Sequence, residues 1–255
     1  MSGEGRKTES MRSVLRLHDD ENRLLKALPE EDLALLKPHL QPAALLRGDV
    51  LFDAAEHIEH VYFPQSGVVS LVTLMRDGAS VEAGTIGREG GVGLVSSSGT
   101  RLAAARGVVQ IPGRARRIEV ARFRTALERS PALRDLVQRY TEALLAQVLQ
   151  TVACNALHSV EQRFCRWLLT CRDRTGSDVI PLTQEAVAEM LGVQRTTVTA
   201  AAKALQTQGL IRYRRGLIEC VDLPGLQQTS CECYDVVRSR FEQLLPMTFR
   251  DSPES

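Results

Sequence analysis

Residues 182–220 constrain the fold of this chain more than any other stretch, because they have the order helix, tight turn, helix and basic hairpin. Thr183 is a good N-cap for the first helix, and Gly192 interrupts the apolar periodicity where a turn must lie. Gly209 ends the second helix, as a glycine directly after the last helical residues does. This order predicts two short helices that meet at a fixed turn, followed by a two-stranded hairpin.

The second predicted helix and the hairpin together form a basic surface. Residues 193–217 contain five Arg or Lys residues and no Asp or Glu. A polyanion is the natural partner of such a surface, and the second helix of a helix–turn–helix lies in the major groove of DNA. A solvated helical hairpin without a partner is the alternative. If the surface binds DNA, the contacts come from Thr183, Gln194, Arg195, Thr196, Thr197, Thr199, Lys203, Arg212, Arg214 and Arg215.

This stretch resembles the winged helix–turn–helix of the Crp/Fnr family of bacterial transcription regulators. The residues that carry the resemblance are Leu182-Thr183, Ala188, Leu191-Gly192-Val193, Arg195-Thr196-Thr197-Val198 and Leu205…Gly209-Leu210-Ile211. The resemblance extends over about residues 25–222 and is more specific in the DNA reader than elsewhere. It implies an α+β fold with an N-terminal jelly-roll β-barrel sensor domain, a long dimerisation helix and a C-terminal winged helix–turn–helix.

The rest of the sequence fits this plan. Short β-rich runs follow one another from Leu45, with a strong hairpin signal at Arg76-Asp77-Gly78, as in a barrel or a sandwich. The predicted domains are a flexible N-terminus (1–22), a cyclic-nucleotide-binding-like β-barrel domain (23–130), a dimerisation helix (131–157), a winged helix–turn–helix DNA-binding domain (158–230), and a C-terminal helix and tail (231–255).

The predicted dimerisation helix begins at Pro131 and has an apolar residue at every third or fourth position. The apolar stripe is wide for a helix with one neighbour, which indicates packing on its own barrel and on a second copy of the chain. A helix buried within a single chain is the alternative. The residues expected at the dimer interface are Leu136, Val137, Tyr140, Leu144 and Val148.

The glycine-rich stretch that begins at Gly87 departs from the cyclic-nucleotide pattern. The family resemblance implies a Gly-Glu pair and an Arg-Ser/Thr-Ala run that hold the nucleotide. Here Arg88 follows the glycine and displaces Glu89 by one residue, while Leu102 replaces the hydroxyl residue after Arg101. Unpaired polar groups of a buried ligand are costly, so cyclic AMP is not the expected effector. These five residues remain the candidate effector pocket for an unknown signal, and a cyclic-nucleotide-responsive activator is the alternative.

The six cysteines and five histidines point to no metal and to no certain cofactor. Cys231-Glu232-Cys233 is a C-x-C pair without two further cysteines at metal-ligand spacing, so no zinc site is predicted. Some relatives in the family hold an iron–sulfur cluster on N-terminal cysteines, but no cysteine here precedes Cys154. The histidines lie in no haem-attachment motif. A structural or redox role for Cys231 and Cys233 stays open.

Composition sets the remaining expectations. The net charge is only +1, so affinity for DNA depends on the local cluster of cations. There is no apolar run of ~18 residues and no apolar signal segment near the start, which predicts a cytoplasmic protein that does not enter a membrane. No P-loop, H-E-x-x-H or G-x-S-x-G motif is present, so an enzyme is not expected. The expected partners are double-stranded DNA with a palindromic operator, a second copy of the chain and RNA polymerase. An enzyme, or a protein-interaction module with a degenerate DNA reader, is the alternative from a different class.

Overall fold

The computed structural model describes residues 21–246. Most of the predicted flexible N-terminus therefore lies outside the described residues, as does the end of the predicted tail. Asn22, the last residue of that predicted segment, has defined contacts with the sensor domain. Asn22 is buried, and its side chain accepts a hydrogen bond from the Leu25 amide and donates to the carbonyl oxygens of Pro64 and Gly90 at 2.8 and 2.9 Å. Asn22 thus caps the first helix and fastens it to the sensor domain.

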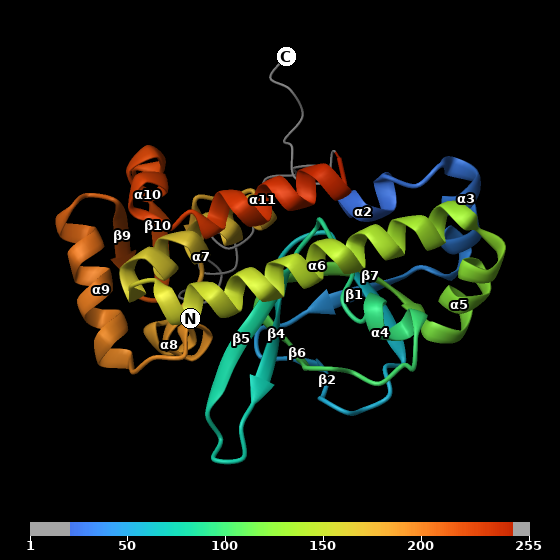
Figure 1. Cartoon of the computed structure of the whole chain (residues 1–255), viewed down its shortest axis with the longest axis horizontal. Coiled ribbons are helices and arrows are strands. Elements are labelled where there is room, and N and C mark those ends of the chain that lie inside the picture. The colour runs from blue at the N-terminus through green and yellow to red at the C-terminus, as the bar shows by residue number, and fades with distance from the viewer. Residues whose placement is uncertain (1–20, 247–255) are drawn as a thin grey trace, which may run out of the picture.

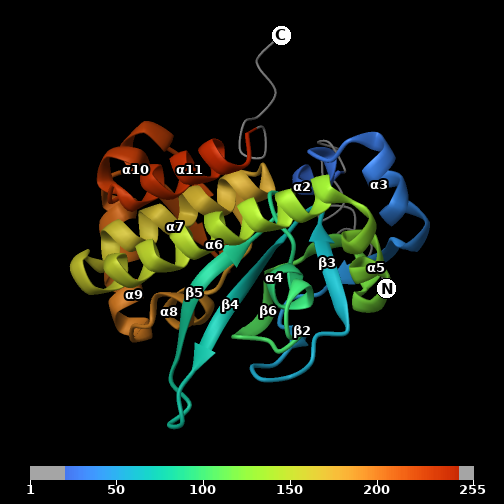
Figure 2. The same cartoon turned by 45° about the vertical axis from the view of Figure 1, so that its right-hand side comes forward.

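The sensor domain is built on two antiparallel sheets (Figures 1 and 2). One has the order β1 (Gln41–Leu45), β7 (Gly113–Glu119), β3 (His60–Pro64), and the other β2 (Val50–Phe52), β6 (Arg106–Ile111), β4 (Val68–Leu74), β5 (Ser80–Ile86). The predicted β-barrel is therefore a jelly roll of two sheets that are not hydrogen-bonded to each other within the described chain. The sequence did not predict β1, because Pro42 and two alanines are poor strand formers.

Short helices close the sensor domain around one apolar core. They are α2 (Arg23–Lys26), α3 (Glu30–Leu36), the 3-10 helix η1 (Lys37–His39), α4 (Leu94–Ser98) and α5 (Val120–Arg129). Phe63 and Phe123 are buried between the sheets and the helices, with ring centroids 6.3 Å apart. This separation suits a tilted aromatic pair, so the two rings hold strand β3 against helix α5.

Helix α6 (Pro131–Leu157) runs from the sensor domain to the C-terminal domain (Figures 1 and 2). Ser130 caps it by accepting a hydrogen bond from the Leu133 amide at 2.8 Å. Three of the residues expected at a dimer interface, Leu136, Val137 and Tyr140, are instead buried in the core of their own sensor domain. The apolar residues of α6 that face outward come later in the helix, and they include Leu145, Leu149 and Val152.

The C-terminal domain is built around a second apolar core, which Val68 of β4 and Ile111 of β6 also enter. Its elements are α7 (Val160–Thr175), β8 (Val179–Ile180), α8 (Gln184–Leu191), α9 (Arg195–Thr207), β9 (Ile211–Arg214), β10 (Leu217–Cys220) and α10 (Leu223–Thr229), with the sheet order β8-β10-β9. Helix α11 (Cys233–Leu244) then returns along α6, and its residue Phe241 is buried in the core of the sensor domain (Figure 1). The last helix therefore links the two halves of the molecule.

Candidate DNA-binding surface

Helices α8 and α9 meet at a tight turn with the geometry that the sequence predicts. The Thr183 hydroxyl accepts a hydrogen bond from the Ala186 amide at 3.3 Å and so caps α8. Gly192 ends α8 in the left-handed conformation, with φ of +62°, which a side chain at this position would disfavour. Gly209 follows α9 with φ of +75°, so both predicted glycine stops are confirmed.

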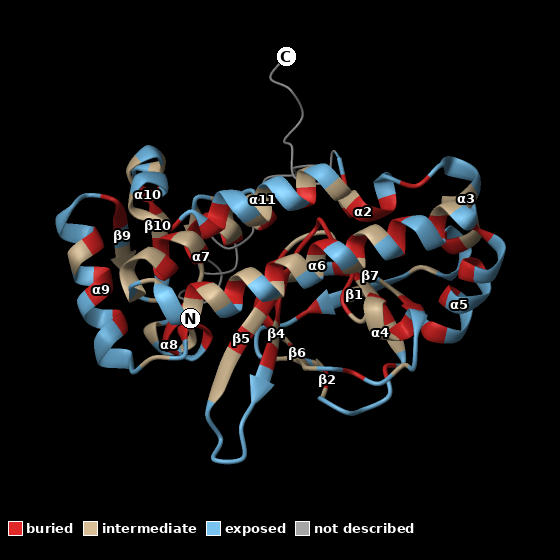
Figure 3. Ribbon diagram, viewed as in Figure 1, coloured by how far each residue is buried: buried red, intermediate tan, exposed pale blue. Residues whose placement is uncertain are grey.

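Helix α9 buries one face and exposes the other (Figure 3). Val198, Ala202 and Leu205 lie in the core of the C-terminal domain. The opposite face is exposed and carries the polar residues predicted to contact DNA, which are Arg195, Thr196, Thr197, Thr199 and Lys203, with Gln194 at the N-cap position. The N-terminal half of α9 therefore presents the length and chemistry that a major-groove helix needs.

Two of the predicted cations are paired with carboxylates from outside residues 193–217. Arg195 Nη1 lies 2.8 Å from Glu185 Oε1 of α8, and Arg212 Nη1 lies 2.6 Å from Glu219 Oε2 of β10. The net positive charge of this surface is therefore smaller than the sequence of residues 193–217 suggests, because Glu185 and Glu219 lie beside its arginines. The Arg212–Glu219 pair could have been predicted from the sequence, because a hairpin that turns at Arg215 and Gly216 places Arg212 opposite Glu219. All four side chains are exposed, so phosphates can compete for the arginines at little cost.

The hairpin of β9 and β10 forms a wing beside α9. Its turn has Arg215 at φ of +49° and Gly216 at φ of +76°, and Arg214 and Arg215 are exposed. Tyr213 holds the wing in place: its hydroxyl donates to the Leu182 carbonyl oxygen at 3.0 Å, and its amide donates to Gln206 Oε1 at 2.9 Å. The wing cations therefore sit at a fixed place relative to α9, as a backbone contact beside a major-groove helix requires.

The structure does not bring the predicted effector-pocket residues together as a nucleotide site. Glu89 is buried, and its Oε1 accepts from the Gly87 amide at 2.9 Å and from Arg174 Nε at 2.8 Å. Arg101 donates to the carbonyl oxygen of Ile58, while Leu102 is 45% exposed. The Glu89 carboxylate is thus already ion-paired with Arg174 of α7, a helix of the C-terminal domain.

The Glu89–Arg174 pair belongs to a buried polar joint between the sensor sheet, α6 and α7. Arg174 Nη2 donates to Gln147 Oε1 at 2.7 Å, and Gln147 Nε2 donates to the Thr85 carbonyl oxygen at 3.0 Å. A Cβ on Gly87 would come within 2.6 Å of the Arg174 side chain, so only a glycine fits there. No local pattern in the sequence indicates this joint, because Arg174 lies 85 residues from Glu89.

A second buried carboxylate lies near this joint. Glu82 of β5 accepts hydrogen bonds from the Ser70 hydroxyl and from Trp167 Nε1 of α7, the latter at 3.2 Å. Burial raises the pKa of Glu82 to about 7, although both hydrogen bonds and the neighbouring Arg166 act in the opposite direction. Next to it, Val81 packs against the turn at Gly192, so β5 touches the DNA reader directly.

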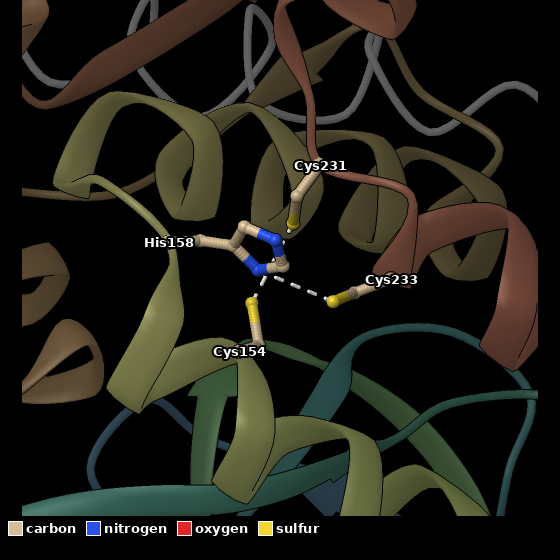
Figure 4. Close-up of side chains that lie close together, drawn as sticks. All are labelled: Cys154, His158, Cys231 and Cys233. Carbon is tan, nitrogen blue, oxygen red and sulfur yellow. Dashed lines mark hydrogen bonds between the residues drawn. The ribbon is translucent and has the colours of Figure 1, made fainter.

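The prediction of no zinc site considered only cysteines spaced closely along the sequence. In the structure, two further potential metal ligands, Cys154 and His158 at the end of α6, lie beside Cys231 and Cys233 (Figure 4). Spacing along the sequence could not show this, since Cys231 lies 73 positions after His158.

The sequence matches two family models. One describes the Crp-like helix-turn-helix domain and covers residues 162–229, and the other describes the cyclic nucleotide-binding domain and covers residues 43–130. No curated protein matches the sequence.

Solved structures share the fold at low sequence identity. A putative transcriptional regulator of the Crp/Fnr family from Eubacterium rectale is 16% identical, with a TM-score of 0.63 over 81% of this chain and 96% of that one. FixK2 from Bradyrhizobium japonicum is 15% identical, with a TM-score of 0.62 over 75% and 98% of the two chains. The c-di-GMP responsive global regulator CLP from Xanthomonas campestris is 15% identical, with a TM-score of 0.62 over 76% and 100%.

A cyclic nucleotide-binding domain joined by a long helix to a winged helix–turn–helix defines the class of transcription regulators that carry sensor and DNA reader in one chain. The two family models together match well over half of this sequence, and the chain belongs to the Crp/Fnr family. The predicted fold class, family and regulatory function are confirmed. In the part of the chain that the structure describes, no helix has both the length and the apolar character to cross a bilayer.

Proposed function

We propose that this regulator binds a palindromic operator as a homodimer, with one copy of α9 in the major groove of each half-site. The observation that supports this most is the exposed polar face of α9 with the wing cations Arg214 and Arg215 beside it. These elements lie at the end of the molecule opposite α3 and α5 (Figure 1). Two such ends brought together by a two-fold axis read two half-sites about one helical turn apart.

The apolar stripe of α6 supports the dimer. Leu145, Leu149 and Val152 are more than half exposed and follow one another at spacings of four and three residues. Leu144 and Val148, two of the residues predicted from the sequence, are half-buried next to them. This spacing produces a helix–helix seam of the coiled-coil type, and closed two-fold dimers are the commonest oligomers. The proposed interface is therefore the second half of α6. It does not include the first half, where Leu136, Val137 and Tyr140 are buried in the sensor domain.

The proposed effector is not cyclic AMP. A nucleotide site needs a carboxylate that is available to the ribose and an arginine that is available to the phosphate. Glu89 is already held by Arg174, and the hydroxyl residue expected after Arg101 is Leu102. Calorimetry with cyclic AMP tests this: the absence of binding at micromolar ligand supports the proposal, and micromolar affinity favours the cyclic-nucleotide-responsive alternative.

The wider setting follows from the family. We propose RNA polymerase as a protein partner, the cytoplasm as the location and regulation without enzymatic activity, since the fold consists of a sensor domain and a DNA reader.

A salt titration tests the DNA-binding surface. Phosphate contacts release counterions, so affinity for duplex DNA should fall by about 10³-fold or more between low and moderate salt if roughly six to ten phosphates are neutralised per dimer. Exchange of both Arg214 and Arg215 for alanine should make the slope of log affinity against log salt shallower by about one for each phosphate that the variant leaves without its cation. Arg122→Ala is the matched control, because Arg122 is exposed on α5 at the opposite end. A flat salt dependence, or an equal effect of the control, would contradict the proposal.

A further inference from the structure

Four metal-ligating side chains converge between the end of α6 and the start of α11 (Figure 4). They are the thiols of Cys154, Cys231 and Cys233 and the imidazole of His158, and their ligand atoms all lie within 4.8 Å of one another. The three cysteines are almost completely buried, and the side chain of His158 is 15% exposed. Neither the proposed DNA contacts nor the sensor domain's core uses any of them.

The fold explains why these residues meet. Cys154 and His158 are four residues apart at the C-terminal end of α6, so they lie on the same face of the helix. Cys231 lies in the link between α10 and α11, and Cys233 is the first residue of α11. Because α11 packs along α6, the C-x-C pair is placed over the Cys-x-x-x-His pair.

The distances suit a single tetrahedral ion. Zinc bonds to thiolate at about 2.3 Å, which places two thiolate ligands of one ion ~3.8 Å apart. Cys154 Sγ lies 3.5 Å from Cys231 Sγ, and Cys233 Sγ lies 3.4 Å from His158 Nδ1. An iron–sulfur cluster distributes its protein ligands over at least two irons, which requires a wider arrangement than this one.

Surrounding groups orient and balance these ligands. His158 turns Nδ1 toward the thiols and Nε2 toward Glu232, whose Oε2 is 3.2 Å away. A carboxylate on the far nitrogen fixes the tautomer and raises the basicity of a metal-binding imidazole. Gln150 Nε2 donates to Cys233 Sγ at 3.0 Å, and the buried Arg163 guanidinium donates at 3.2 Å to Oδ1 of Asn155, the residue that follows Cys154. Three thiolates around Zn²⁺ carry one net negative charge, which this cation offsets.

We propose that Cys154, His158, Cys231 and Cys233 bind one zinc ion that fastens α11 to α6. The protein supplies all four ligands, which is the pattern of a structural zinc site rather than a catalytic one. The site joins the end of the long helix to the helix that carries Phe241 into the sensor core. The zinc ion therefore fixes how the C-terminal domain is held against the sensor domain.

Metal analysis of the full-length protein tests the site directly. Protein purified under reducing conditions from zinc-supplemented medium should hold close to one zinc ion per chain. Replacement by Co²⁺ should give the intense visible absorption of a tetrahedral thiolate site. Cys154→Ala and Cys231→Ala should lose the metal, whereas Cys220→Ala, which removes a buried cysteine of β10, should keep it.

Two further variants separate metal binding from general damage to the fold. His158→Cys keeps a four-ligand set and should retain the metal, whereas His158→Ala should not. Glu232→Gln should weaken zinc affinity by ~10-fold or more, since it removes the carboxylate behind the imidazole. Asp235→Asn, an exposed acid on the same helix, should leave zinc affinity unchanged.

Several results would overturn the proposal. Reduced, folded protein that takes up neither zinc nor cobalt would do so, as would iron and sulfide in place of zinc. A Cys154–Cys231 disulfide as the stable state of the protein under the same reducing conditions would also contradict it, because a disulfide removes two of the ligands. Loss of metal in the Cys220→Ala control as well would mean that the loss seen in the ligand variants is not specific to the four proposed ligands.

Discussion

At the scale of single residues, the cations of the DNA reader are exposed, whereas the charged groups between the reader and the sensor domain are buried. Arg195 and Arg214 lie in a stretch whose charge is visible in the sequence, and both are exposed. Glu82 and Arg174 are buried, and their partners come from distant strands and helices. A buried charge leaves no local signal, because its stability depends on which residues the fold brings beside it.

Arg195 is the residue expected to read a base. The guanidinium of Arg195 suits guanine O6 and N7, whereas Thr196 lacks the carboxylate that accepts from cytosine. Arg195→Ala should therefore cost ~1–3 kcal/mol per half-site and relax the preference at one base pair. Lys203→Ala, at a proposed phosphate contact, should weaken binding to all sequences alike. Binding to a set of single-base operator variants measures both effects, and an unchanged base preference in Arg195→Ala would mean that another residue reads the base.

Glu82 makes stability depend on pH. Its pKa is raised from 4.5 to about 7 in the folded chain, so the folded protein keeps a proton that the unfolded chain releases. The contribution of protonated Glu82 to the stability of the folded protein is fully present below about pH 4.5. It is lost as the pH rises to about 7. Glu82→Gln removes this dependence. The difference in free energy of unfolding, variant minus wild type, should therefore increase by ~3 kcal/mol between pH 4.5 and pH 7.5. Urea denaturation of both proteins at the two pH values measures the gain, and a difference that stays constant would show that Glu82 titrates normally.

At the scale of elements, local signals predicted most helices and hairpins. Pro131 at the start of α6, Gly192 between α8 and α9, and Gly78 in the β4–β5 turn each mark a boundary that the structure confirms. The packing of these elements against one another was harder to predict from the sequence. The stripe of α6 was visible, but which part of it the sensor domain covers depends on how the helix lies on its own chain.

The second half of α6 is the element expected to form the dimer. Leu149→Asp places a charge in the proposed seam, where burial without a partner is costly. Sedimentation should then show a monomer, and DNA affinity should fall together with dimerisation. Leu46→Asp is the matched control, because Leu46 and Leu149 are both 62% exposed and Leu46 lies outside α6. An intact dimer in Leu149→Asp would mean that the chains associate through a different surface.

At the scale of the whole molecule, the sensor domain and the DNA reader are joined by buried polar contacts rather than by apolar packing alone. Glu89, Arg174, Gln147 and Thr85 connect the sensor sheet, α6 and α7 in one chain of hydrogen bonds. A change in the sensor that moves Glu89 therefore acts on the helix that precedes the reader.

Removing one partner of the joint should be costly. Arg174→Ala leaves the Glu89 carboxylate buried without its ion pair, which should lower the free energy of unfolding by ~3–5 kcal/mol. Asp135→Ala breaks an exposed pair with Arg139 and should change the free energy of unfolding by less than about 1 kcal/mol. Thermal denaturation compares the two variants. Equal effects would contradict the buried joint, and partial recovery in the double variant Arg174→Met, Glu89→Gln would support it.

The central claim is that this chain is a dimeric reader of DNA sequence, and selection of bound duplexes from a random pool by the purified protein tests it most directly. We expect a two-fold symmetric consensus with half-sites about one helical turn, ~34 Å, apart and a guanine contact in each half. The Leu149→Asp variant should fail to select the full palindrome. The absence of any enriched sequence, or a consensus without symmetry, would contradict this claim.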